Sequence, residues 1–264
     1  MHVWVDDGKE RKPQFYSMSP TSALDRIRVV LCETTHPGNI GAAARAMKAM
    51  GLSRLVLVNP KSFPHPEALA LATGADDVLG AARVCASLEE ALAGTVFAVA
   101  STARPRDLAH EVVDCRDACA RMAAEAAVAE VALVFGTERA GLTARQISHC
   151  HLIAMIPANE AFSSLNLAQA VQVFAYELRL AVAGAPPLRQ HAGSREGAEL
   201  ATHEEMEGFF GQLEQTFYAT GFLDEKEPKR LMQRMRRLFA RARAEKTEVN
   251  VLRGFLSAIR SKLE

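Results

Sequence analysis

The stretch LIAMIPANEAFSSLNLAQAVQVFAYELRLAV (Leu152–Val182) decides the fold class, because it passes from a buried strand through a polar turn into a long helix. Its first residues, Leu152–Ile156, are apolar at consecutive positions, which is typical of a strand covered on both faces. The helix expected over Leu165–Val182 is apolar over much of its circumference, which indicates burial on more than one side. In a domain of this size a second chain is the expected cover, so we predict a homodimer.

The alternation of apolar strands with helical patterns extends back to Arg26. The expected strands are bounded by Gly, Pro, Asn or Thr, and several are apolar throughout. We therefore predict an α/β fold, with a mostly parallel sheet and helices on both faces. The other expected strands are Ile27–Cys32, Leu55–Val58, Val96–Ala100 and Val131–Phe135, and the other expected helices are Gly41–Met50, Pro66–Thr73, Leu88–Ala93 and Arg116–Ala127.

The pattern changes beyond Val182. Residues 183–199 are rich in Gly, Ala and Pro and are expected to form a linker, whereas residues 200–264 contain helical patterns only. The predicted domains are thus a flexible leader at 1–25, the α/β domain at 26–182, this linker and a small all-helical extension. Helices of the extension are expected at Glu204–Ala219, Pro228–Ala242 and Glu248–Leu263, and the middle one is strongly basic.

Composition excludes some classes of protein. The formal net charge is zero, so bulk charge gives no sign of a nucleic-acid partner. No apolar run reaches the roughly 18 residues that a membrane span needs, and the leader lacks the apolar core of a signal peptide. The five cysteines are odd in number and lack C-x-x-C spacing, which favours reduced, buried thiols. We expect a cytoplasmic protein without a metal.

Three polar motifs each follow an expected strand, which is where open α/β sheets bind ligands. They are HPGNIGAAAR (His36–Arg45), VFGTERAGL (Val134–Leu142) and IPANEAFSSLN (Ile156–Asn166). In the first, the glycines are spaced for a tight turn or a close approach to a phosphate or another helix. The dinucleotide pattern G-x-G-x-x-G is absent, and no acidic residue follows about twenty positions on.

The other two motifs also have simple structural explanations. Glu138 is expected near the N-terminus of the next helix, where a carboxylate is stabilised. Ser163 or Ser164 is a good helix N-cap, which places Asn166 inside the first turn. Capping explains one serine but not Asn166, because asparagine is mildly unfavourable inside a helix.

Together the three motifs resemble those of the SpoU branch of the SPOUT RNA methyltransferases, and the resemblance covers about Arg26–Leu180. Within that branch, CETTHPGNIG (Cys32–Gly41) and the tail segments Leu213–Leu223 and Arg236–Arg243 are similar to the bacterial tRNA 2′-O-methyltransferases that act on the pyrimidine at anticodon-loop position 32. The resemblance implies a C-terminal trefoil knot, S-adenosylmethionine as cofactor, tRNA as partner and an active site at a dimer interface.

The resemblance also implies site residues. The catalytic set would be Arg45, Ser164, Asn166, Asn39 and Glu138. The cofactor would contact Ser101, Thr102, Ala103, Gly136, Ile156, Ser163, Ser164 and Leu165, and RNA would contact Arg45, Arg230, Arg234, Arg237 and Arg241.

Other functions remain open at this point. Within the family, ribosomal RNA or another tRNA position could be the target. A non-catalytic RNA-binding assembly protein with an inactive methyltransferase core is the alternative outside enzymes, although the predicted polar set is complete. A nicotinamide-dependent oxidoreductase is disfavoured by the missing dinucleotide pattern. The basic face of the Pro228–Ala242 helix is either an RNA-binding surface or simply a solvated face that nearby glutamates neutralise.

Overall fold

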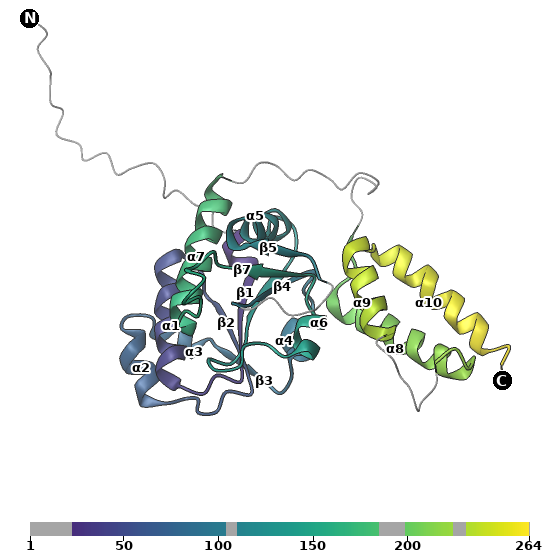
Figure 1. Ribbon diagram of the computed structural model, residues 1–264, viewed down its shortest axis with the longest axis horizontal. Coiled ribbons are helices and arrows are strands. Elements are labelled where there is room, and N and C mark those ends of the chain that lie inside the picture. The colour runs from purple at the N-terminus through teal and green to yellow at the C-terminus, as the bar shows by residue number, and fades with distance from the viewer. Residues whose placement is uncertain (1–22, 104–109, 185–198, 224–230, 264) are drawn as a thin grey trace, which may run out of the picture.

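The computed structural model describes residues 23–103, 110–184, 199–223 and 231–263 (Figure 1). Its centre is a sheet of seven strands, and every neighbouring pair in it is parallel. The predicted α/β class with a mostly parallel sheet is therefore confirmed. In spatial order the strands are β3 (Arg83–Cys85), β2 (Arg54–Val58), β1 (Ile27–Cys32), β6 (Val131–Phe135), β4 (Phe97–Ser101), β7 (Leu152–Met155) and β5 (Val112–Asp114).

Helices cover both faces of the sheet. Consecutive side chains of each inner strand point to opposite faces, so both sets of side chains are buried. In β1, for example, Val29 and Leu31 enter one apolar cluster and Val30 and Cys32 enter the other. The first cluster lies under α1 (Pro37–Met50), α2 (Pro66–Ala72), α3 (Asp76–Gly80), α5 (Cys115–Ala126) and α7 (Leu167–Gly184), and the second lies under α4 (Leu88–Leu92) and α6 (Ala144–Ser148).

The two edge strands were not predicted from the sequence. Strands β3 and β5 have three residues each and are mostly exposed or half-buried, so neither carries the apolar run by which the inner strands were found. The five-residue helices α3 and α6 were missed because one turn of helix has too few residues to show a period.

Helix α1 begins at Pro37, four residues before the predicted start. Proline suits the first helical position, since its fixed φ matches the helix and its missing N–H needs no partner there. Gly41 then lies inside the helix, where a Cβ atom would stand 2.0 Å from the carbonyl oxygen of Ala68. Of the two uses that the sequence allowed for this glycine, the structure supports the close approach of two helices, α1 and α2.

The C-terminal extension is helical, as predicted. Helices α8 (His203–Ala219), α9 (Leu231–Ala242) and α10 (Lys246–Arg260) share an apolar core of their own that contains Phe209, Phe210 and Val249. This helical tail packs beside the sheet rather than on one of its covered faces (Figure 1). The predicted leader and linker lie largely outside the described residues, and the domain boundaries stay a prediction.

The tail is attached to the sheet through the residues that precede and begin β4. The backbone N–H of His203 donates to the carbonyl of Thr95 at 2.7 Å. Arg243 donates to the carbonyl of Val96 at 3.0 Å and pairs with Glu125 at 2.6 Å. These polar contacts fix the tail at the amino end of the sheet.

Three other expectations concern threading, membranes and cysteines. The trefoil knot depends on how the chain threads rather than on strand order, so it stays a prediction. None of the described helices has the length and apolar character of a membrane span. All five cysteines are free and buried, as expected for reduced thiols.

Candidate active site

Three loops at the carboxyl ends of β4, β6 and β7 surround one open cavity of about 800 Å³. The structure brings all eight residues of the predicted cofactor set to its walls: Ser101, Thr102, Ala103, Gly136, Ile156, Ser163, Ser164 and Leu165. Their contact with a cofactor stays a prediction, but their placement around one cavity supports it.

The loop after β6 closes on itself through its two glycines. The N–H of Gly141 donates to the carbonyl of Thr137 at 2.9 Å, and these two residues form an isolated antiparallel bridge. A Cβ atom at Gly136 would lie 2.1 Å from the carbonyl carbon of Gly141, so no side chain fits there. Gly141 itself has a φ of +67°, in the left-handed region that glycine favours. The glycines thus shape the cavity wall.

One chain of hydrogen bonds joins the three sequence motifs. The Glu138 carboxylate accepts from the backbone N–H groups of Thr35 (3.0 Å) and His36 (3.1 Å) and from the Thr35 hydroxyl (2.9 Å). It also accepts from Nδ2 of Asn39 at 2.9 Å. The Oδ1 atom of Asn39 in turn accepts from Nδ2 of Asn166, again at 2.9 Å. Side chains about a hundred positions apart in sequence are therefore held in a fixed order.

Hydrogen bonding keeps Glu138 ionised. Partial burial alone would raise the pKa of this carboxyl group, but the hydrogen bonds from Asn39, Thr35 and His36 outweigh that effect and lower it to about 2. The carboxylate lies at the N-terminus of α1, not at the next helix along the chain as the sequence suggested. It is stabilised there by backbone N–H groups of Thr35 and His36. A carboxyl group with so low a pKa is a poor proton acceptor near neutral pH.

The predicted helix cap is wrong. Helix α7 begins at Leu167, and the residue before it, Asn166, accepts from the N–H of Ala168 at 2.9 Å. The backbone N–H of Asn166 in turn donates to Oε1 of Gln169 at 3.2 Å. Asn166 is therefore the N-cap, in place of Ser163 or Ser164, and it does not sit inside the helix. Its amide group serves two purposes, since Oδ1 caps α7 while Nδ2 reaches Asn39.

Of the predicted catalytic residues, Ser164 lies outside this chain of bonds but lines the cavity, whereas Arg45 stands apart from both. It is exposed on α1, six residues beyond Asn39, which is about 9 Å further along the helix axis. It forms no hydrogen bond or ion pair with any other residue that the structure describes, and it does not line the cavity. Its guanidinium is thus available to a ligand that extends from the cavity along α1.

The basic helix α9 separates into two sets of arginines. Arg236 pairs with Glu207, and Arg243, which follows the last residue of α9, pairs with Glu125, so these two support the packing of the tail. Arg234 and Arg241 are exposed and Arg237 is half-buried, and none of the three pairs with an acidic residue in the described part of the chain. The predicted RNA contact Arg230 lies outside the described residues. The glutamates of α8 therefore neutralise only part of the basic helix.

Sequence reasoning missed two groups of residues. Thr35 and His36 hold Glu138 mainly through backbone N–H groups, which residue type does not reveal. A buried cluster of His149, His203 and Glu207 forms where the tail meets the sheet domain. Its only signal in the sequence is the i, i+4 spacing of His203 and Glu207, which places both on one face of a helix.

Comparison with known proteins matches both parts of the chain. Residues 26–176 match the family model described as the SpoU rRNA Methylase family, and residues 204–264 match the model described as the tRNA methyltransferase TrmJ, C-terminal domain. The tRNA (cytidine/uridine-2′-O-)-methyltransferase TrmJ of Escherichia coli strain K12 is 48% identical over 244 residues, which cover 89% of this chain and 96% of that protein.

Solved structures agree with these matches. The crystal structure of TrmJ from Z. mobilis ZM4 matches with a TM-score of 0.77 and 32% identity, over 88% of this chain and 98% of that one. A probable methyltransferase from Bordetella pertussis Tohama I matches with a TM-score of 0.57 and 50% identity, over 61% of this chain and 98% of that one. The likeness to the first of these structures extends over most of the chain.

Proposed function

Because the chain belongs to the SpoU rRNA methylase family and carries the TrmJ C-terminal domain, we propose that it methylates the ribose 2′-oxygen of the pyrimidine at tRNA anticodon-loop position 32. RNA 2′-O-methyl transfer is the activity of this family's TrmJ members by their names, and this chain is an enzyme of that class. The anticodon position is the finer part of the proposal. A tRNA substrate also implies a cytoplasmic location.

The observation that carries the proposal is the bond chain from Glu138 through Asn39 to Asn166 beside the open cavity. The family motifs supply one residue each to this chain. A non-catalytic RNA-binding protein would have no need to hold three polar side chains in one order next to a cavity. The geometry therefore favours an active enzyme over an inactive methyltransferase core.

The cavity suits S-adenosylmethionine as the methyl donor. Its apolar wall, which includes Ile156, Leu165 and Leu167, fits a flat base, and loop backbone from three strand ends surrounds the remainder. When bound, this cofactor supplies a methyl group already activated for transfer. The protein's own task is then to align the ribose oxygen and to stabilise the negative charge that develops on it.

We assign Arg45 to the ribose and its phosphate. An arginine stays protonated in proteins and is therefore a poor base, but its planar fork of donors binds phosphate and ribose oxygens well. The exposed position of Arg45 on α1 leaves that fork open to RNA. Its role would be to orient the 2′-oxygen and to stabilise the emerging alkoxide.

Glu138 and Asn39 act as positioning residues in this scheme. A carboxylate with a pKa of about 2 does not take a proton at neutral pH, so Glu138 fixes Asn39, and Asn39 fixes Asn166. Ser164 is exposed at the rim of the same cavity and is free to contact the reacting ribose. Of the predicted catalytic set, Arg45, Ser164 and Asn166 are the residues that would touch substrate or cofactor.

The exposed arginines of α9 would bind tRNA phosphates, because phosphate contacts supply most of the affinity of RNA-binding proteins. Arg234, Arg237 and Arg241 are the described candidates, since Arg236 and Arg243 are engaged within the protein. The tail would thus hold the tRNA while the cavity and Arg45 act on one nucleotide.

A homodimer remains part of the proposal. One stripe of α7 is buried in the core, but Tyr176 and Leu180 on the same helix are 49% and 48% exposed. Exposed apolar side chains on a helix that borders the cavity are typical of an interface. A mass measurement by light scattering tests this, and a monomer at micromolar concentration would contradict it.

The decisive experiment incubates the protein with methyl-labelled S-adenosylmethionine and unmodified tRNA, then maps the label by nuclease digestion and mass spectrometry. One 2′-O-methyl group on the anticodon-loop pyrimidine is the expected result. Label at another tRNA position, or in ribosomal RNA only, would refute the proposed target and support the alternatives within the family. No transfer to either RNA would refute the proposed activity.

A further inference from the structure

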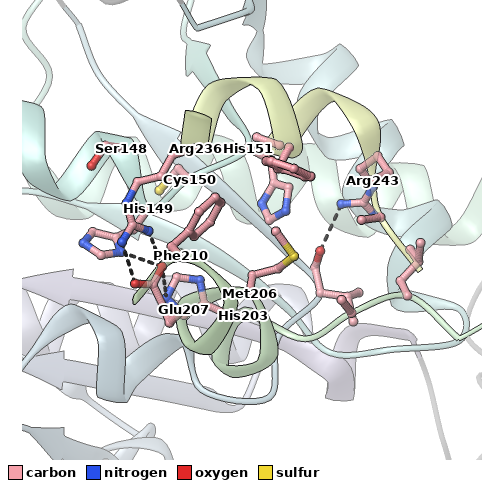
Figure 2. A pocket seen from close by; sticks show the side chains of 16 residues that line it. Ser148, His149, Cys150, His151, His203, Met206, Glu207, Phe210, Arg236 and Arg243 are labelled. Atoms are coloured by element: carbon pink, nitrogen blue, oxygen red, sulfur yellow. Dashed lines mark hydrogen bonds and ion pairs between the residues drawn. The ribbon is translucent and has the colours of Figure 1, made fainter. Parts of the chain in front are cut away.

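A second cavity, of about 520 Å³, lies between the helical tail and the sheet domain, and it shares no lining residue with the candidate active site (Figure 2). The segment that joins α6 to β7 forms one wall and α8 and α9 form the other. Figure 2 shows His149, His203 and Glu207 pointing toward one another across this boundary. Nothing in the proposed methyl transfer uses these residues.

The three side chains converge on one oxygen atom. Nδ1 of His149 is 3.6 Å from Oε1 of Glu207, and Nε2 of His203 is 3.8 Å from the same oxygen. Three potential ligand atoms, one from each residue, lie within 4.8 Å of one another. Atoms bound to one tetrahedral ion about 2.0–2.1 Å from each ligand would stand about 3.4 Å apart, so only a small adjustment is needed.

Both imidazole nitrogens that face Glu207 are buried without a hydrogen-bond partner. A buried polar atom left in that state is costly, and it calls for a specific explanation. The side chains of His149 and His203 are each 6% exposed, so bulk water does not supply the missing partner. Two unpartnered nitrogens aimed at one carboxylate oxygen are the arrangement expected around a cation.

The surroundings prepare both histidines to act as ligands. The other nitrogen of His149, Nε2, lies 3.2 Å from Oε1 of Glu89. A carboxylate behind a histidine in this way is the usual support of a metal-binding imidazole. The side chain of His203 is buried, and its Nε2 faces Glu207 without a hydrogen-bond partner.

We propose that His149, His203 and Glu207 bind one divalent transition-metal ion of the Zn²⁺ class, with water as a fourth ligand. Two imidazoles and one carboxylate suit Zn²⁺, whereas Mg²⁺ and Ca²⁺ prefer oxygen ligands alone. The ion would tie α8 to the segment before β7, and so hold the tail against the sheet domain. The sequence led us to expect no metal, because the five cysteines lack C-x-x-C spacing.

Arg236 is the group with which the ion must share Glu207. Its guanidinium contacts both carboxylate oxygens, and the Nη2–Oε2 bond of 2.7 Å can persist while Oε1 turns to the ion. Arg236 also lies over the ring of Phe210, 4.6 Å from its centroid, which holds the guanidinium in place when one bond is lost.

The test is a calorimetric titration of the full-length, chelator-treated protein with Zn²⁺ and, separately, with Mg²⁺. We expect one Zn²⁺ per chain and no response to Mg²⁺. His149→Gln and His203→Gln should each weaken Zn²⁺ binding at least tenfold, while His65→Asn, a matched control on α2 that keeps an N-cap acceptor, should bind as the wild type does. The proposal would be overturned if the wild type did not bind Zn²⁺, or if both cluster variants bound Zn²⁺ with the affinity of the wild type.

Two further measurements keep the test decisive if a cluster variant fails to fold, as circular dichroism would reveal. The visible spectrum of Co²⁺ added to the wild type should show tetrahedral coordination by nitrogen and oxygen ligands, and an octahedral spectrum would refute the site. Glu89→Gln, which removes the carboxylate behind His149 and weakens the pairing of this side chain with the exposed Arg145, should weaken Zn²⁺ binding about tenfold. Unchanged affinity in that variant would contradict the assigned role of Glu89.

Discussion

Replacing Glu138 by glutamine should show whether this carboxylate organises the candidate active site. The substitution keeps the shape of the side chain but removes its charge, and it turns one acceptor atom into a donor. That donor would face groups that are already donors, namely the N–H groups of Thr35 and His36 and the amide of Asn39. We expect the loop after β6 to separate from the start of α1 and Asn39 to lose its fixed orientation.

The expected loss of stability follows from the shift in the pKa of Glu138. A shift from the ordinary 4.5 to about 2 corresponds to roughly 3 kcal/mol of preference for the charged form, since one tenfold change is about 1.4 kcal/mol. Because Glu138 is only partly buried, solvent screens part of this, and we expect a loss of about 1–2 kcal/mol in the free energy of unfolding at pH 7.

The stabilising contribution of Glu138 depends on pH, because the pKa of this carboxyl group is lower in the folded protein than in the unfolded chain. The contribution of Glu138 is fully present above about pH 4.5 and is lost as the pH falls toward 2. Urea unfolding of wild type and Glu138→Gln should therefore differ at pH 7 and converge in acid. The exposed Glu160→Gln serves as the control. Equal stability of Glu138→Gln and wild type at pH 7 would refute the organising role.

The remaining predictions concern single sites. Arg45→Ala should lower methyl transfer by at least about 10²-fold, and Arg45→Lys should recover little because it lacks the bidentate fork; near-normal turnover of Arg45→Lys would contradict the role. Ser164→Ala should lose methyl transfer with its fold intact, and an unchanged single-turnover rate would remove Ser164 from the site. Gly136→Ala should cost about 2–4 kcal/mol in thermal unfolding, because its Cβ would lie 2.1 Å from Gly141, whereas Gly211→Ala in α8 meets no atom within 4 Å and should be neutral or slightly stabilising. Arg234→Glu with Arg241→Glu should weaken tRNA binding about tenfold or more and reduce its salt dependence while leaving cofactor affinity unchanged, and equal tRNA affinity would count against the RNA surface.

Much of the fold could be predicted because the inner strands are uniformly apolar. Strands β1 and β6 were predicted at their observed bounds, since both are buried along their whole length. The edge strand β5 could not be found, because only its middle residue is partly covered. Burial on both faces leaves a clear pattern in the sequence, and partial burial does not.

The candidate site was predictable only in part. Resemblance to a family selected Asn39, Glu138 and Asn166, but the bonds between them depend on where α1 starts, which was misplaced by four residues. The cap of α7 was assigned to the wrong residue because serine and asparagine are both good N-caps. The sequence could not predict that His149 joins His203 and Glu207, since these residues come together only when the tail packs against the sheet domain.

The attachment of Arg243 has a mechanical consequence. Its guanidinium lies over the ring of Phe97, the first residue of β4, while the last residue of that strand, Ser101, lines the cofactor cavity. One inner strand, about 16 Å long, thus has the tail that we propose binds tRNA at one end and the cavity proposed for the methyl donor at the other. A force that bound tRNA exerts on the tail would act along the axis of β4, which is paired with a strand on each side. tRNA binding and methyl transfer would therefore be connected through one stiff strand.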